Sequence, residues 1–140
     1  MNRELISHTG IAVRDLDESI ARYSLLTGDK NPLITDVPDQ KVRVAIFSSN
    51  NNINHPGGRI ELLAPTSPDS PIAKFLEKRG EGLHHICIYV DDIKIKLAEL
   101  KKSGTRLIDE TPRIGAEGNL IAFVHPSGAN GVLIELEERT

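Results

Sequence analysis

Two histidines and two glutamates, His8, His85, Glu61 and Glu135, are the residues of this 140-residue chain whose types and surroundings best suit chemistry. Each histidine lies in a stretch that alternates between apolar and other residues, a pattern typical of a strand with two different faces. Each glutamate lies between two aliphatic residues, so its carboxylate must emerge on the opposite face of the strand. That face is not expected to be a dry core, because an unpaired charge buried there would be very costly. Two imidazoles and two carboxylates suit one divalent ion of the zinc, cobalt, nickel, manganese or iron class. A pair of buried His–Glu hydrogen bonds is the alternative that the residues leave open.

The four residues occupy equivalent places in a sequence that repeats itself. The segment His8–Val13 aligns with His85–Val90, and Ile60-Glu61-Leu62 resembles Ile134-Glu135-Leu136. Such self-similarity indicates two copies of one structural unit. The predicted boundaries within a single domain of residues 1–140 are module one at about 5–65, a linker helix at about 67–81 and module two at about 83–137.

Each copy predicts the element order βαβββ. A strand at 5–13 or 84–90 comes first, and a helix follows that begins after Asp15 or Asp92, because aspartate is a favoured N-cap and apolar residues recur at i, i+4 and i+7. Three short strands then follow in each copy, at 33–37, 42–48 and 58–64 and at 106–109, 119–124 and 131–136. The predicted fold class is α+β, with two tandem βαβββ modules that form a pseudo-twofold mixed sheet lining one cleft.

The composition narrows the class of protein. Hydrophobic residues make up 39% and charged residues 26%, which fits a globular domain rather than a disordered chain. The net charge of −3 leaves no basic surplus for phosphates, so we expect no nucleic acid partner. No apolar run approaches the roughly 20 residues that span a bilayer, and the first residues lack the apolar stretch of a signal peptide, so we expect no membrane partner and a cytoplasmic location. The single cysteine, Cys87, excludes an internal disulfide and a multi-cysteine zinc site.

Several stretches of the chain carry a resemblance to a known family. They are Glu61–Leu76 (ELLAPTSPDSPIAKFL), Gly82–Ile86 (GLHHI), Pro112–Gly115 (PRIG) and His125-Pro126 leading into Gly131–Glu135 (GVLIE). Together with the duplicated unit, they resemble the vicinal oxygen chelate superfamily of glyoxalases, bleomycin-resistance proteins and dioxygenases, and within it the methylmalonyl-CoA epimerase family. The resemblance implies that His8, His85 and Glu135 stand at metal-ligand positions. Glu61 takes a fourth such position, which is Gln in some epimerases and Glu in others.

The implied reaction interconverts the two C2 epimers of methylmalonyl-CoA through an enolate. The C2 proton is too weakly acidic for an unaided carboxylate base, and one divalent metal ion (Co, Zn, Ni or Mn) would place positive charge where the enolate oxygen develops. Because inversion needs proton removal from one face and delivery to the other, we expect Glu61 and Glu135 to act as alternating general base and acid. Some epimerases carry a glutamate proposed as a base where this chain has Val44, so that role does not carry over.

An acyl-CoA substrate needs hydrogen-bond donors for its carboxylate and for its CoA tail. We expect Gln40 to donate to the carboxylate, and Lys74, Arg113 and the turn between Gly115 and Gly118 to bind the tail. For the two charged residues, a solvated surface position is the alternative. Superfamily members often dimerise, so the resemblance also implies a homodimer.

Two other functions compete with the epimerase reading. A glyoxalase I-type lactoylglutathione lyase shares the metal, the fold and the enolate chemistry, but the stretch Ser67–Leu76 and the His125-Pro126 ending resemble the epimerases more. A non-catalytic small-molecule-binding member of the superfamily is the other, and such members typically lack the full metal set. Turnover of methylmalonyl-CoA against that of a methylglyoxal–glutathione adduct separates the two enzymes.

Overall fold

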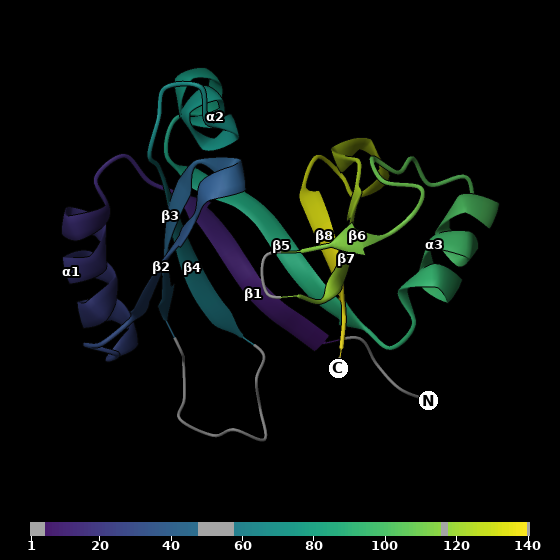
Figure 1. Cartoon of the computed structure of the whole chain (residues 1–140), viewed down its shortest axis with the longest axis horizontal. Helices are drawn as coiled ribbons and strands as arrows, with labels where there is room; N and C mark the ends of the chain where they lie inside the picture. The colour runs from purple at the N-terminus through teal and green to yellow at the C-terminus, as the bar shows by residue number, and fades with distance from the viewer. Residues whose placement is uncertain (1–4, 48–57, 116–117, 140) are drawn as a thin grey trace. The chain divides into compact units, whose positions relative to one another are not determined.

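The computed structural model describes residues 5–47, 58–115 and 118–139. Module one contains β1 (Leu5–Ala12), α1 (Leu16–Thr27), β2 (Leu33–Val37), the 3₁₀ helix η1 (Pro38–Gln40), β3 (Val42–Phe47) and β4 (Arg59–Pro65). A helix, α2 (Pro71–Arg79), follows. Module two contains β5 (Gly82–Val90), α3 (Ile93–Lys102), β6 (Arg113–Ile114), β7 (Leu120–Val124), the 3₁₀ helix η2 (Pro126–Gly128) and β8 (Leu133–Glu138). The predicted order βαβββ, twice, with a linker helix between, is confirmed (Figure 1).

Backbone contacts divide the chain into two units, His8–His84 and Met1–Ser7 together with His85–Thr140. The strands of the first unit lie in the order β2-β3-β4-β1, to which β1 contributes from His8 onward, and those of the second in the order β5-β8-β7-β6. In each unit the strand that opens the motif pairs in parallel with the strand that closes it, and the other neighbours are antiparallel. Both units therefore share one topology, which confirms the α+β class, while the pseudo-twofold cleft stays a prediction.

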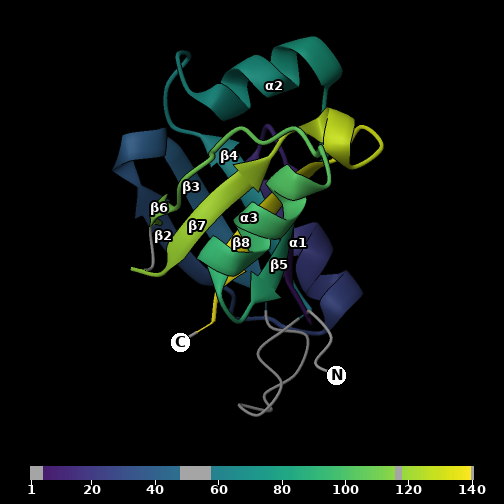
Figure 2. The same cartoon turned by 90° about the vertical axis from the view of Figure 1, so that its right-hand side faces the viewer.

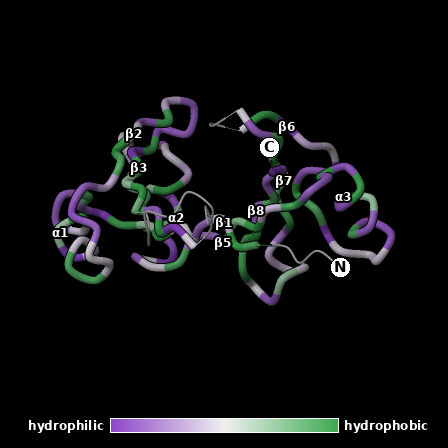
Figure 3. Tube along the Cα trace, turned by 90° about the horizontal axis from the view of Figure 1, so that it is seen from below, coloured by the Kyte–Doolittle hydropathy of each residue, from purple (hydrophilic) through white to green (hydrophobic). Residues whose placement is uncertain are grey.

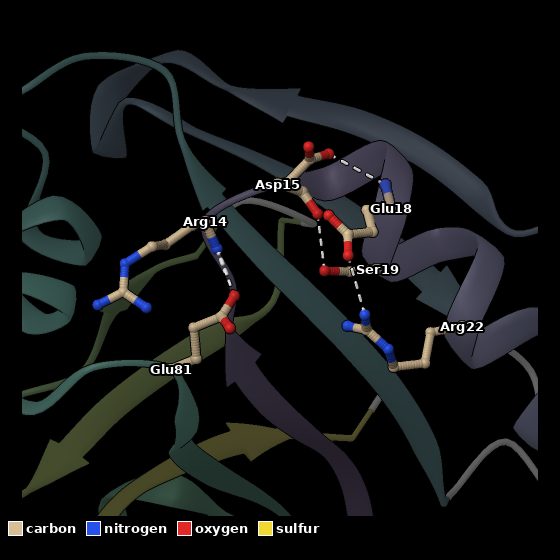
Figure 4. A network of polar contacts seen from close by, with 6 residues as sticks. All are labelled: Arg14, Asp15, Glu18, Ser19, Arg22 and Glu81. Atoms are coloured by element: carbon tan, nitrogen blue, oxygen red, sulfur yellow. Dashed lines mark hydrogen bonds and ion pairs between the residues drawn. The ribbon is translucent and has the colours of Figure 1, made fainter.

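Equivalent aspartates begin the two main helices. The carboxylate of Asp15 accepts a hydrogen bond from the backbone N–H of Glu18 at 3.0 Å (Figure 4). Asp92 caps α3 in the same way, accepting from the backbone N–H of Ile95 at 3.1 Å. The carboxylate of Glu18 pairs with Arg22 one turn along the helix at 3.0 Å. Because an N-cap satisfies an N–H group that the helix itself leaves unpaired, the aspartates fix where each helix starts.

Two helices cover opposite faces of the strands in the first unit. Leu62 and Leu63 are neighbours on β4 and point to opposite faces, as residues of a strand must. Leu62 belongs to the face that packs on α1, with Leu16, Ile20, Tyr23, Phe47 and Val13. Leu63 belongs to the face that packs on α2, with Ala12, Val42, Val44, Ile72 and Leu76. The backbone N–H of Arg14 donates to the carboxylate of Glu81 at 2.8 Å and so ties the end of β1 to the loop after α2 (Figure 4).

In the second unit one helix, α3, covers one face of the strands. Figure 2 shows α3 lying in front of β7 and β8. The buried core between them consists of Val90, Ile93, Leu97, Ala122, Val124 and Leu136. Strand alternation sends the intervening residues of β5, β7 and β8 to the opposite face. That face carries His85 and Glu135.

The sequence predicts a strand at 106–109, and this prediction is wrong. The strand that follows α3 is instead β6 at Arg113–Ile114, whereas residues 106–109 run beside β7 with an isolated antiparallel bridge from Leu107 to Val124 and irregular hydrogen bonds. The N–H groups of Ile108 and Asp109 both donate to the carbonyl of Phe123, at 2.9 and 3.2 Å. The side chain of Asp109 in turn accepts from the N–H of Phe123 at 2.8 Å. Because a regular antiparallel ladder gives each carbonyl one backbone donor, this arrangement ends the ladder.

The helices are amphipathic and short. Figure 3 shows the traces of α1 and α3 changing between hydrophilic and hydrophobic residues along their length. Among the described residues, no helix has the length and apolar character needed to cross a membrane.

Candidate functional site

The first unit brings His8 of β1 and Glu61 of β4 into contact. Parallel pairing places Gly10 opposite Glu61, so His8 lies two residues before that point on the same face of the sheet. The Nδ1 atom of His8 lies 3.2 Å from Oε2 of Glu61, and both residues are buried. The strands of this unit therefore place one imidazole and one carboxylate together.

The second unit repeats this arrangement with His85 of β5 and Glu135 of β8. Cys87 lies opposite Glu135, so the histidine again precedes the residue opposite the glutamate by two positions. The Nε2 atom of His85 lies 3.3 Å from Oε1 of Glu135. The histidine is buried and the glutamate is half-buried.

The two distances suit a pair of metal ligands. Ligand atoms about 2.0–2.1 Å from a zinc-class ion at tetrahedral angles lie roughly 3.3 Å from each other. The N···O separations of 3.2 and 3.3 Å match that value. A neutral N–H···O hydrogen bond is most often about 2.9–3.0 Å long, so the same contacts stand at the long end of its range. Each unit thus holds one imidazole and one carboxylate at a spacing that suits two ligands of a divalent cation.

A further buried carboxylate, Glu137, lies on the same face as Glu135 and is not among the predicted site residues. Its Oε2 accepts a hydrogen bond from Asn119 at 2.8 Å, and its Oε1 lies 3.6 Å from the sulfur of Cys87. The signal was present, because Glu137 follows Glu135 by two residues on a strand. Burial, followed by the nearby Glu135 and Glu137 carboxylates, raises the pKa of the Cys87 thiol. Cys87 therefore lines this face as a neutral thiol.

Gln40, the predicted partner of the substrate carboxylate, ends η1 and is exposed. The backbone carbonyl of Gln40 accepts a hydrogen bond from the hydroxyl of Ser70, which is also the N-cap of α2. The next residue, Lys41, has a left-handed backbone (φ 55°) and pairs with the carboxylate of Asp69. These contacts fasten the turn that carries Gln40 to the start of α2.

The residues predicted to bind the CoA tail lie in both units. Lys74 is exposed on α2. In the second unit Arg113 lies on β6, with its guanidinium 5.5 Å from the centre of the Phe123 ring and its Nε 3.5 Å from Asp109. Gly115 and Gly118 close the turn between β6 and β7, where the N–H of Gly118 donates to the carbonyl of Gly115 at 3.1 Å. A Cβ at position 115 would lie 2.9 Å from the Ile121 side chain, so the close approach of β7 requires glycine there.

Val44, where some epimerases have a glutamate, is a core residue in this chain. It is 6% exposed and packs with Leu63, Ala12 and Ile72 on the face that α2 covers. The apolar side chain therefore belongs to the packing under α2, and the nearby carboxylate on that face of the first unit is Glu61 of β4.

Comparisons with known proteins relate this chain to one superfamily. A protein-family model described as Glyoxalase/Bleomycin resistance protein/Dioxygenase superfamily matches residues 7–123. An ethylmalonyl-CoA/methylmalonyl-CoA epimerase from Cereibacter sphaeroides is 42% identical over 135 residues, which cover 95% of this chain and 96% of that protein. The crystal structure of methylmalonyl-CoA epimerase from Mycobacterium tuberculosis is similar with a TM-score of 0.83 at 38% identity, covering 97% of this chain and 88% of that one.

A further similar structure is a methylmalonyl-CoA epimerase in complex with methylmalonyl-CoA and NH4+. It has a TM-score of 0.85 at 34% identity, covering 99% of this chain and 96% of that one. The similarity spans both repeats and the helix between them.

Proposed function

Because the chain belongs to the glyoxalase, bleomycin-resistance and dioxygenase superfamily, we propose that it interconverts the C2 epimers of methylmalonyl-CoA. The comparisons support an isomerase that acts on an acyl-CoA, since relatives that match nearly the whole chain are epimerases of this substrate. The observation that carries the proposal is the repeated His–Glu contact, at 3.2 Å in one unit and 3.3 Å in the other. That pair of contacts supplies the donors that enolate chemistry needs.

His8, Glu61, His85 and Glu135 would together hold one divalent ion of the cobalt, zinc, nickel or manganese kind. Such an ion supplies positive charge for the oxygen that becomes negative when the C2 proton leaves. Neutral imidazoles and ionised carboxylates are the ligands that these metals accept. The distances within each pair, close to those between two ligands of one ion, support this assignment.

Glu61 and Glu135 exchange the C2 proton in the proposed reaction. One carboxylate removes the proton from one face of C2 and the other acid delivers a proton to the opposite face, so that the configuration inverts. The position of Val44 supports this assignment, because a buried valine cannot serve as a base there. Each glutamate lies beside a histidine on the strand face opposite α1 or α3, and in the first unit that face also carries the residues that pack on α2.

The substrate is held by groups of both units in this proposal. Gln40 donates to the free carboxylate, while Lys74, Arg113 and the backbone N–H groups of Gly115 and Gly118 bind the CoA tail. Attachment of the Gln40 turn to Ser70 supports its role, because a fixed donor loses less entropy on binding. We further propose one domain over residues 1–140, a homodimer and a cytoplasmic location, and sedimentation analysis tests the dimer.

Deuterium wash-in at C2 of methylmalonyl-CoA tests the proposal. In D2O, the wild-type chain is expected to exchange the C2 proton, and a chelator is expected to stop exchange until a divalent metal is restored. Absence of exchange together with turnover of the methylglyoxal–glutathione adduct would assign the chain to the lyases instead. Absence of both activities would favour a binding protein.

A further inference from the structure

A pocket of about 320 Å³ lies on α2 of the first unit. It is lined by Pro71, Lys74, Phe75, Glu77, Lys78, Arg79 and His84. The volume falls at the lower end of the range of small-molecule pockets, about 300–1,000 Å³. The pocket can therefore take a ligand fragment the size of a nucleoside.

The pocket gathers positive charge on an acidic chain. The lining contains three basic residues, Lys74, Lys78 and Arg79, and one acidic residue, Glu77, although the whole chain carries a net charge of −3. Lys74 and Lys78 are exposed one turn apart, and neither forms an ion pair with any residue that the structure describes. Like charges at i and i+4 repel each other, and a bound anion removes that repulsion. The electrostatics of the pocket therefore favour an anionic ligand with more than one negative charge.

Flat groups line the pocket beside these charges. The Phe75 ring meets the His84 ring edge-on, with 4.9 Å between the ring centres. The guanidinium of Arg79 lies 5.9 Å from the centre of the Phe75 ring. Aromatic rings and guanidinium planes are the groups on which nucleobases stack. The lining thus combines basic side chains that can bind phosphate groups with flat groups on which a nucleobase can stack.

The helix that carries the pocket lies on the same face of the strands as the His8–Glu61 contact. Ala12 follows His8 by four residues on β1, and Leu63 follows Glu61 by two on β4, so each pair shares a face. Ala12 and Leu63 are the residues on which Ile72 and Leu76 of α2 pack. A long ligand whose reacting end reached Glu61 would therefore have α2 beside it on the same face.

We propose that this pocket binds the phosphorylated adenosine end of CoA, an inference that rests on the proposed acyl-CoA function. Lys74 and Lys78 pair with phosphate groups, and the adenine stacks beside Phe75 and Arg79. This assignment adds Lys78, Arg79 and Phe75 to the substrate-binding residues, and places the nucleotide on α2 of the first unit.

Calorimetric binding of adenosine 3′,5′-bisphosphate to the full chain tests the pocket without any need for turnover. The wild type is expected to bind it, and Lys74→Ala/Lys78→Ala is expected to weaken binding by about tenfold or more, because two charge-assisted contacts are lost. The matched control is Lys94→Ala/Lys102→Ala, which removes two exposed lysines from α3 and is expected to bind like the wild type. Failure of the wild type to bind, or equal affinity in the Lys74→Ala/Lys78→Ala variant, would overturn the assignment.

Kinetics then link the pocket to the reaction. In Lys74→Ala/Lys78→Ala, the KM for methylmalonyl-CoA is expected to rise by about tenfold, while the KM for methylmalonyl-pantetheine, which lacks the nucleotide, stays at its wild-type value. An equal rise for both substrates would contradict nucleotide binding by α2. Intact binding of the bisphosphate without any epimerisation would refute the proposed reaction and leave the pocket standing.

Discussion

The Nδ1 atom of His8 lies 3.2 Å from Oε2 of Glu61, whereas the matching contact of the second unit uses Nε2 of His85. The duplication thus preserves the pair of residues and the distance between them, but not the ring nitrogen that faces the carboxylate. The packing of α1 and α3, the equivalent helices of the two units, does not require the pair, because both glutamates lie on the strand face opposite these helices. A shared chemical task is the simpler cause of the repeated contact.

Loss of either carboxylate is expected to stop proton exchange. Glu61→Gln and Glu135→Gln each remove a base or acid while keeping a similar shape, so C2 deuterium exchange should fall by about 10²–10⁴. Far-UV circular dichroism checks that folding is retained. Glu110→Gln, an exposed residue of the second unit, serves as control and should exchange like the wild type. Full exchange in both single variants would remove the two-glutamate mechanism.

The aspartates that begin α1 and α3 are expected to contribute equally to stability. Each carboxylate accepts one N–H of its helix, so Asp15→Ala and Asp92→Ala should each lower the free energy of unfolding by about 1 kcal/mol. Asp15→Asn and Asp92→Asn keep a capping side chain and should remain within a few tenths of a kcal/mol of the wild type. Urea denaturation measures all four variants. Equal stability of the alanine and asparagine variants would show that neither cap matters.

Acid should weaken the contact between Lys41 and Asp69. The Lys41 ammonium, followed by the Ser67 hydroxyl, lowers the pKa of the Asp69 carboxyl to about 2. Because the folded pKa lies below the unfolded value of about 3.9, this contribution to stability is present above about pH 4 and is lost as the pH falls through about 2. The difference in unfolding free energy between the wild type and Asp69→Asn should therefore shrink over that range. The control is Asp39→Asn, since Asp39 forms no ion pair with a described residue, and its difference should not follow this course.

The Cys87 thiol is expected to resist chemical modification. Cys87 is fully buried, and that burial, then the Glu135 and Glu137 carboxylates, raises the pKa of the thiol, so the reactive thiolate is scarce. At pH 8 a thiol-specific reagent should react with the native chain about a hundredfold or more slowly than with the urea-unfolded chain. Equal rates in both states would show that the face bearing Cys87 is open to solvent.

Much of the fold could be predicted from the sequence, because a pattern found in one repeat recurs at the equivalent positions of the other. The helices, their aspartate caps and the superfamily resemblance are confirmed. The strand predicted at 106–109 is wrong, because whether Ile108 and Asp109 share one carbonyl depends on tertiary contacts that no local pattern encodes.

The candidate site was predictable in part. Alternation along the strands placed His8 and Glu61 on one face, and likewise His85 and Glu135, and the structure brings each pair together. Glu137 was open to the same reasoning, yet its contact with Asn119 joins β8 to a residue of the connection between β6 and β7 that has no periodic signal. The α2 pocket depends on how Phe75 meets His84, which only packing decides.

The most direct test of the shared metal site is a calorimetric titration of the metal-free chain with Co²⁺ or Zn²⁺. If both His–Glu pairs hold one ion, the chain binds one equivalent, and His8→Ala and His85→Ala each weaken that binding by at least about tenfold, although they lie in different units. Two equivalents per chain, or wild-type affinity in either variant, would contradict a single site built from both units.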